Sequence, residues 1–228
     1  RKAIEIKPDY AMAHSNLGII LRDLGKLQEA EISTRKAIEL NPNFAKSHYI
    51  LGKILKDIGN LQEAFDSYLK SIELNPTLPN IYPSITRLIK ESDPSQLNKS
   101  KLKKILSILL ERNDITHREL VRAFNFVYRH EIINSLEKID LDFSGIELLI
   151  KNKVIINALK KITFCDLELE KMLTKVRRNI CDRIAKNIET INDSELKFII
   201  ALGEQCFLNE YIHLVTKEES IFVNKWEN

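Results

Sequence analysis

The chain has 228 residues, of which 44% are hydrophobic and 29% charged, enough for one large or two modest domains with hydrophobic cores. Its formal net charge is +3 at pH 7, with acids and bases intermixed, so no charge imbalance points to nucleic acid or an anionic membrane. No apolar run reaches the roughly 18 residues of a membrane-spanning helix. The three cysteines form no CxxC pair, and they favour a reducing, cytoplasmic location with free thiols.

Residues 8–75 contain two successive copies of one 34-residue pattern. The same residue occurs at 19 of the 34 positions of segments 8–41 and 42–75. Residues 1–8 match residues 35–42, and Pro76 opens a third period. The chain therefore begins inside a repeat, and we expect it to be a piece of a longer protein.

Each period predicts a hairpin of two helices. Apolar residues of the first helix of the second copy follow the i, i+3, i+4, i+7 spacing of one helix face, at Leu51, Ile54, Leu55 and Ile58. Gly25 and Gly59 stand where the first helix must end, because glycine adopts the left-handed conformation cheaply. An Asn-Pro pair ends the second helix, since proline cannot continue it. Gly18 and Gly52 fall where the two helices must approach each other.

This pattern resembles the tetratricopeptide repeat (TPR), whose 34-residue unit has Leu-Gly in its first helix and Ala, an aromatic residue and a closing Pro in its second. The matching residues are Leu17, Gly18, Ala30, Ala37 and Pro42, then Leu51, Gly52, Ala64, Tyr68 and Pro76. The sequence departs from the family at His14 and His48, where Trp is common, and at Thr34, which replaces the aromatic residue. The resemblance implies a right-handed helical solenoid whose first helices line a concave groove for a peptide or partner protein.

The resemblance also implies which residues face that groove. By family position they are Met12, Ser15, Asn16, Ile19, Arg22, Asp23, Lys46, Tyr49, Lys53, Lys56 and Asp57. Asn16 occupies the place where related repeats use an amide to hold the backbone of an extended peptide, and Ile50 replaces it in the next copy. Lys53 and Lys56 could attract a carboxylate, and Tyr49 could stack on a ligand. The alternative is that these are exposed polar residues without a ligand.

From Pro76 onward the 34-residue period fades. Residues 81–89 still predict a helix, the start of a degenerate third repeat, and the Ser92-Asp93-Pro94 segment is a candidate domain boundary. We therefore expect a repeat domain over residues 1–92 and a second, all-helical domain over residues 94–228. Because repeat hairpins cannot bury their apolar faces alone, the segment after residue 76 should cap them.

The sequence of the second domain predicts a series of helices and no strand. Apolar stripes run through Leu102, Ile105, Leu106, Leu109 and Leu110, and through Leu120, Ala123, Phe124, Val127 and Ile132. Further helices are expected over residues 148–162, 166–188 and 193–215. The last of these carries apolar residues on nearly all sides, so we expect it to be central and buried, with Gly203 allowing close helix contact. The predicted fold is thus a solenoid continuing into an irregular helical bundle.

A second resemblance lies in residues 94–220. The run at residues 201–211 (ALGEQCFLNEY) is similar to the helical connector of bacterial and cyanobacterial proteins that join TPRs to an S-adenosylmethionine-dependent methyltransferase domain. That resemblance implies a substrate-recruiting connector, with the catalytic domain after residue 228. Long TPR arrays also accompany glycosyltransferases, which is a third hypothesis.

No chemistry-bearing motif appears in the chain itself. The six glycines never approach closely enough to form a nucleotide-binding or S-adenosylmethionine-binding loop. His14 and His48 lie on separate repeats, and Cys206 and His213 lie about 10 Å apart along one helix, so neither pair suits a metal or a catalytic couple. Basic runs at residues 99–104 and 175–178 lack interleaved aromatics, so we expect solvated faces. The leading hypothesis is a protein-interaction scaffold with no catalytic, cofactor-binding or metal-binding residues and no nucleic-acid or membrane partner; the oligomeric state is left open.

Overall fold

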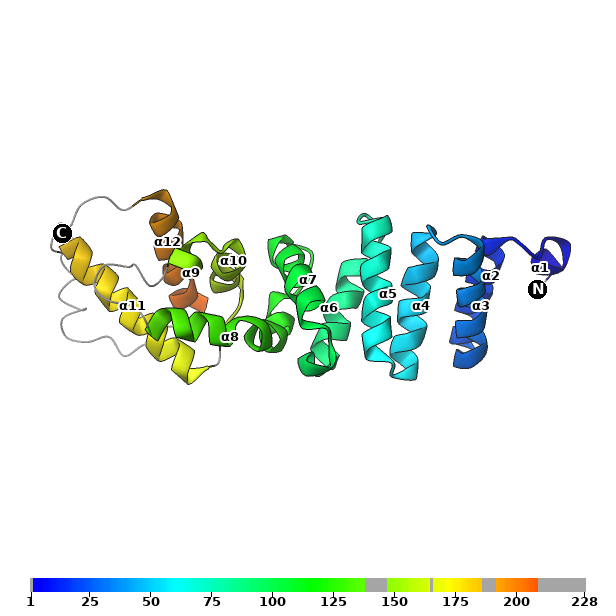
Figure 1. Cartoon of the computed structure of the whole chain (residues 1–228), viewed down its shortest axis with the longest axis horizontal. Helices are drawn as coiled ribbons and strands as arrows, with labels where there is room; N and C mark the ends of the chain where they lie inside the picture. Colours follow the sequence, from blue (N-terminus) through cyan, green and yellow to red (C-terminus); the bar gives the residue numbers. More distant parts are fainter. Residues whose placement is uncertain (1, 138–146, 165, 186–191, 209–228) are drawn as a thin grey trace. The chain divides into compact units, whose positions relative to one another are not determined.

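The computed structural model describes residues 2–137, 147–164, 166–185 and 192–208, and these ranges hold helices and no strand (Figure 1). The all-helical prediction is confirmed. Contacts divide the chain into two compact units, Arg1–Ile105 with Asn113–Glu119, and Leu106–Arg112 with Leu120–Asn228. The division falls inside helix α7 (Lys99–Glu111), after the Pro94 segment at which the sequence predicted a domain boundary.

The first unit is a stack of helical hairpins. Its helices are α1 (Lys2–Ile6), α2 (Ala11–Asp23), α3 (Leu27–Leu40), α4 (Ala45–Ile58), α5 (Leu61–Leu74), α6 (Ile81–Glu91) and the first part of α7. Helix α2 packs on α3, and α4 packs on α5, so each 34-residue period is one hairpin. Helix α4 also contacts both α2 and α3, which stacks the second hairpin on the first (Figure 1).

Glycines set the ends and the spacing of the hairpins, as the sequence predicts. Gly25 and Gly59 have positive φ values of 74° and 96°, and each follows the first helix of its repeat. A Cβ atom added to Gly52 would lie 2.7 Å from ring carbons of Tyr68, and one added to Gly18 would lie 2.1 Å from the Thr34 hydroxyl oxygen. The two helices of each hairpin therefore meet at these glycines.

Apolar packing joins one hairpin to the next. Leu21 and Ala30 of the first repeat form a buried cluster with Ile50 and Ile54 of the second, and Leu17 and Ile19 pack against it. His14 Nε2 lies 2.9 Å from the carbonyl oxygen of Pro8, and His48 Nε2 lies 2.8 Å from that of Pro42. The two histidines thus tie the start of each repeat to its own first helix.

Helix α6 follows the second hairpin, where the sequence predicts the first helix of a degenerate third repeat. It buries Ile81, Ile85, Leu88 and Ile89 and packs on α5. After a short 3-10 turn (Pro94–Gln96), the start of α7 is bonded to α5: the Asn98 N–H donates to Gln62 Oε1 at 2.8 Å, and Lys101 Nζ lies 2.7 Å from Asp66 Oδ1. The segment after residue 76 therefore covers the second hairpin.

The second unit is a helical bundle. It contains the end of α7, then α8 (Val121–Glu137), α9 (Glu147–Lys151), α10 (Lys153–Lys161), α11 (Leu167–Ala185) and α12 (Asp193–Leu208); a 3-10 turn (His117–Leu120) precedes α8. All ten residues of the two predicted apolar stripes are buried. The helix predicted over residues 148–162 is instead two helices. Asn152 separates them, because its side-chain oxygen accepts the N–H of Val154 at 3.0 Å and caps α10.

The prediction for α12 was wrong within the part of it that the structure describes. Phe198, Ala201 and Leu202 are buried, but Leu196 and Ile200 are 47% and 46% exposed. A Cβ atom on Gly203 would meet no described atom within 4 Å, so within the described ranges this glycine makes no close helix contact. The helix buries one face only, and the expected continuation through residues 209–215 lies outside the described ranges.

Candidate functional site: a cationic pocket on the repeats

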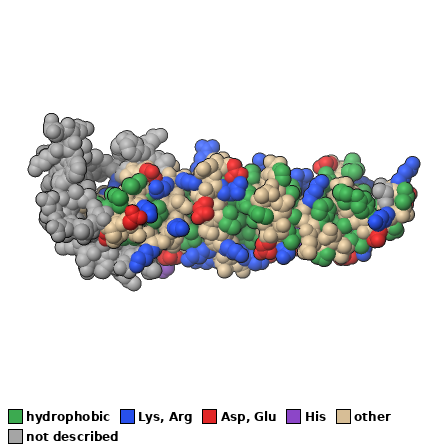
Figure 2. Space-filling model, turned by 90° about the horizontal axis from the view of Figure 1, so that it is seen from above, with side chains coloured by type: hydrophobic (Ala, Val, Ile, Leu, Met, Phe, Trp, Pro, Cys, Tyr) green, Lys and Arg blue, Asp and Glu red, His purple; other side chains and the backbone are tan. Residues whose placement is uncertain are grey.

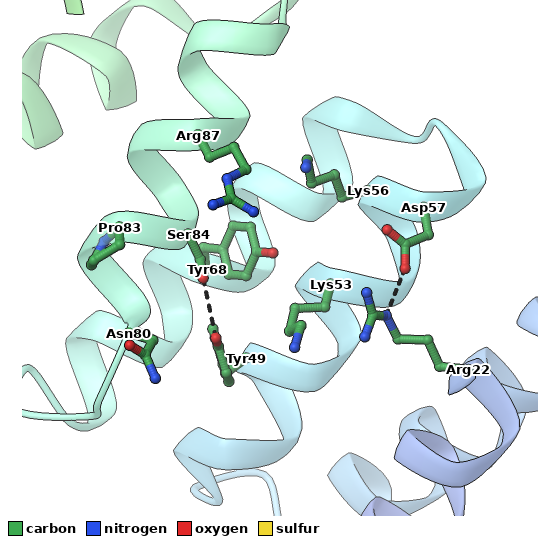
Figure 3. A pocket seen from close by; sticks show the side chains of 10 residues that line it. All are labelled: Arg22, Tyr49, Lys53, Lys56, Asp57, Tyr68, Asn80, Pro83, Ser84 and Arg87. Atoms are coloured by element: carbon green, nitrogen blue, oxygen red, sulfur yellow. Dashed lines mark hydrogen bonds and ion pairs between the residues drawn. The ribbon is translucent and has the colours of Figure 1, made fainter. Parts of the chain in front are cut away.

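A pocket of ≈ 340 Å³ opens on the first unit (Figure 3). Its walls come from α2, α4, α5 and the start of α6, so three successive first helices contribute to it. The lining residues are Arg22, Tyr49, Lys53, Lys56, Asp57, Tyr68, Asn80, Pro83, Ser84 and Arg87.

Helical spacing places these side chains on one wall. Tyr49, Lys53 and Lys56 follow one another at i, i+4 and i+7 on α4, which puts them on the same helix face. Ser84 and Arg87 are three residues apart on α6 and share a face in the same way. The Tyr68 ring extends from α5 and lies directly against Gly52 of α4. A larger residue at position 52 would clash with that ring.

Two ion pairs cross the pocket rim between successive repeats. Arg22 Nε lies 2.6 Å from Asp57 Oδ2, and Lys56 Nζ lies 2.6 Å from Glu91 Oε2. In each pair the partner is 35 residues further along the chain, Asp57 on α4 and Glu91 on α6. The four side chains are 22% to 49% exposed, so each pair contributes about 0–1 kcal/mol to stability.

The floor of the pocket is aromatic. The rings of Tyr49 and Tyr68 have centroids 5.9 Å apart, and the Tyr49 hydroxyl is 3.1 Å from Ser84 Oγ. Lys53 Nζ lies 5.6 Å from the centroid of the Tyr49 ring, a cation–π contact. Burial is the main cause that raises the pKa of Tyr68, so its hydroxyl stays protonated and can donate a hydrogen bond at neutral pH.

The Tyr68 hydroxyl makes no hydrogen bond within the described part of the chain, and the residue lines the open pocket. Figure 3 shows it directed into the space among the side chains of Arg87, Lys53 and Lys56. The Tyr68 hydroxyl is therefore a hydrogen-bond donor that a ligand in this pocket could use.

Five of the residues predicted to face the groove line this pocket: Arg22, Tyr49, Lys53, Lys56 and Asp57. Met12, Asn16, Asp23 and Lys46 are exposed but lie outside its lining. Ile19 is half-buried against the apolar cluster between the repeats. Ser15 is fully buried, with its hydroxyl oxygen unpaired, so it faces no open surface. Contact of any of these residues with a partner stays a prediction.

Five lining residues are not among those predicted to face the groove, namely Tyr68, Asn80, Pro83, Ser84 and Arg87. Tyr68 was assigned to packing alone, because its family position is that of the aromatic residue in the hairpin core. The other four lie on or beside α6, where the period fades. Extending the 34-residue alignment into α6 would have found Arg87, which is one period after Lys53.

Figure 2 shows acidic and basic side chains interspersed on the face that it draws, which matches the intermixed charges of the sequence. Among the described residues, no group of three His, Cys, Asp or Glu side chains could hold a metal ion. No helix in the same ranges is long and apolar enough to cross a membrane. Cys165 and His213, and the side chains of Cys181 and Cys206, lie outside what the structure describes.

Comparison with known proteins agrees with the hairpins. Two family models described as tetratricopeptide repeat match residues 11–44 and 34–66. No curated protein is significantly similar to the chain. The crystal structure of YrrB, a TPR protein with an unusual peptide-binding site, has a TM-score of 0.41 and 15% sequence identity, with 98% of this chain and 96% of that chain covered. At that score the likeness supports no conclusion about function.

Neither matched segment extends past residue 66, so the resemblance of residues 94–220 to a methyltransferase connector gains no support. Residues 209–211, at the end of the run that carries this resemblance, lie outside the described ranges. The matched segments are those that fold as stacked helical hairpins. Residues 11–66 therefore carry tetratricopeptide repeats.

Proposed function

We propose that the first unit is a non-catalytic scaffold that binds a peptide segment of a partner protein, with the pocket as its central contact. The supporting observation is the origin of the pocket lining: side chains from three successive first helices and from α5 meet around one open space. Stacked helical repeats characteristically offer such extended surfaces to protein partners. Polar and aromatic groups with fixed positions suit a peptide, because they can bond its backbone and hold its side chains.

We place this scaffold in the cytoplasm, because three cysteines cannot all pair with one another and suit a reducing compartment. No observation on the described residues favours the methyltransferase or the glycosyltransferase hypothesis.

Selection from a displayed library of random peptides on the whole immobilised chain tests this function. We expect enriched peptides to bind the purified chain in solution, and the double variant Lys53→Glu with Lys56→Glu to weaken that binding at least tenfold. Lys36→Glu, a charge reversal on the outer helix α3, should leave it unchanged. Failure to enrich any peptide, or equal weakening by Lys36→Glu, would contradict the proposal. Circular dichroism of each variant checks that helicity is preserved.

A further inference from the structure

We infer that the pocket on the first unit receives a phosphomonoester group carried by the bound peptide. This inference rests on the proposed function and names the chemistry that the pocket selects. It follows from two observations: the balance of charge in the pocket, and the three unsatisfied donors that converge in it.

The charge balance favours a dianion. Four cationic side chains line the pocket, and Asp57 and Glu91 neutralise Arg22 and Lys56. Lys53 and Arg87 have no carboxylate partner in the described part of the chain. Two positive charges therefore remain. A phosphomonoester carries a charge of about −1.5 to −2 at pH 7, whereas a single carboxylate would leave one cation unmatched.

The donors come from three helices. Arg87 on α6 offers a planar fork of N–H groups, Lys53 on α4 offers an ammonium, and Tyr68 on α5 offers a hydroxyl. Figure 3 shows these groups around one space, with the Tyr68 hydroxyl pointing into it. Donors that approach from three directions suit the three terminal oxygens of a tetrahedral phosphate better than the two coplanar oxygens of a carboxylate.

The Tyr68 hydroxyl supports the inference independently of charge, because it is a neutral donor. It makes no hydrogen bond within the described part of the chain, its ring lies against Gly52 of α4, and the residue lines the open pocket. A hydroxyl in an open pocket can exchange a water molecule for a ligand oxygen. Donation to a ligand oxygen would satisfy it, and a neutral donor there adds selectivity without adding charge.

Titration of the whole chain, followed by the NMR signal of the Arg87 Nε–H group, tests the inference. The probes are N-acetyl-O-phosphoserine methylamide, N-acetylglutamate methylamide and inorganic phosphate. We expect the capped phosphoserine to bind at least about tenfold more tightly than the capped glutamate, as two additional charge-assisted hydrogen bonds would give.

Variants locate the binding. Binding to the variants is followed by the NMR signals of the whole chain. Lys53→Gln and Arg87→Gln should each weaken phosphoserine binding about tenfold, and Tyr68→Phe should weaken it severalfold. Matched changes outside the pocket, Lys36→Gln and Tyr10→Phe, should have no effect. Unchanged thermal unfolding of the variants separates lost contacts from lost fold.

Probe binding is also measured over a series of pH values, because a purely structural role of these residues would not produce a pH dependence. The charged and titratable residues that line the pocket are Arg22, Tyr49, Lys53, Lys56, Asp57, Tyr68 and Arg87, with Glu91 paired to Lys56, and none is a histidine. Phosphoserine binding should therefore tighten as pH rises through about 6, where the probe becomes a dianion. Glutamate binding should show no such step.

Each contrary result removes a defined part of the inference. Equal affinity for the two capped probes would overturn selection of a phosphomonoester. Binding of inorganic phosphate without binding of the capped phosphoserine would overturn carriage by a peptide. Insensitivity to Lys53→Gln and Arg87→Gln would overturn the pocket as the site. If library peptides bind and no phosphorylated probe does, this inference fails while the proposed function stands; if no peptide binds, the proposed function fails.

Discussion

One pair of residues, Gly52 on α4 and Tyr68 on α5, links the packing of the second hairpin to its pocket. The glycine lets the ring lie against α4, and the ring in turn carries its hydroxyl into the pocket. Tyr49 packs on the same ring from the pocket side. A change at Gly52 should therefore affect both the stability of the hairpin and the geometry of the site.

We predict that Gly52→Ala destabilises the second hairpin by about 1–3 kcal/mol, because its Cβ would lie 2.7 Å from the Tyr68 ring and force it to move. Hydrogen exchange of the α4 and α5 amides measures the effect. Gly203→Ala is the matched helical control: its Cβ meets no described atom within 4 Å, so we expect slower exchange in α12 from the better helix former. The same sign for both variants would contradict this account.

A second residue-scale prediction concerns the Arg22–Asp57 pair. Asp57→Asn should lower the free energy of unfolding by no more than about 1 kcal/mol, since the pair is partly exposed. It should also tighten binding of the capped phosphoserine, because Arg22 loses its carboxylate and the pocket gains a positive charge. Calorimetric titration of the variant checks this; weaker binding would show that Asp57 holds Arg22 in a productive position instead.

At the scale of single helices, short polar side chains decide where helices of the second unit begin. Asn152 caps α10, and Asp166 does the same for α11 by accepting the N–H groups of Glu168 and Leu169, both at 3.1 Å. Asp166 also pairs with Arg129 of α8. That hydrogen bond to Arg129 is the main cause that lowers the pKa of Asp166, with smaller contributions from the two N–H groups.

The lowered pKa of Asp166 predicts a dependence of stability on pH. A carboxylate whose pKa is lower in the folded state stabilises the fold above its unfolded pKa of about 3.9, and this contribution is lost as pH falls through the folded value. The second unit should therefore lose stability in acid below about pH 4, and Asp166→Asn should flatten that loss. Arg129→Gln should flatten it in part. Thermal unfolding between pH 2 and 7 measures it, and an unchanged slope in Asp166→Asn would refute the assignment.

At the scale of the whole molecule, each unit can be discussed by itself, and the first is held together by apolar packing between its repeats. Ile54 is fully buried in the cluster that joins the two hairpins, whereas Ile20, one period earlier, is 56% exposed. The same repeat position thus has two environments. The four polar side chains at the pocket rim are partly exposed and contribute far less to stability.

We predict that Ile54→Ala lowers the unfolding free energy of the first unit by about 2–4 kcal/mol, as a cavity in a packed core does. Ile20→Ala, the same chemical change one repeat earlier, should cost less than about 1 kcal/mol, because little apolar area is buried there. Urea denaturation followed by circular dichroism compares them. Similar losses in the two variants would indicate that Ile20 is covered in solution.

The sequence by itself determined the hairpins of the first unit. Period, glycine positions and Asn-Pro pairs are local features, and each fixes a helix end or a close approach through backbone geometry alone. Buried stripes such as Leu102 and Phe124 also followed from spacing, because a helix face is a property of nearby residues. The predicted helix over residues 148–162 was wrong because the Asn152 side chain caps α10 and divides the segment into two helices.

Only the tertiary structure decided which side chains meet. The pocket joins residues of α2, α4, α5 and α6 that lie up to 65 positions apart, from Arg22 to Arg87, and no local pattern specifies such a meeting. Tyr68 illustrates the reason: its family position predicts a packed ring, but the direction of its hydroxyl depends on the neighbouring repeat. The exposure of Ile200 was undecidable from periodicity for the same reason, since burial depends on which helices pack against a face.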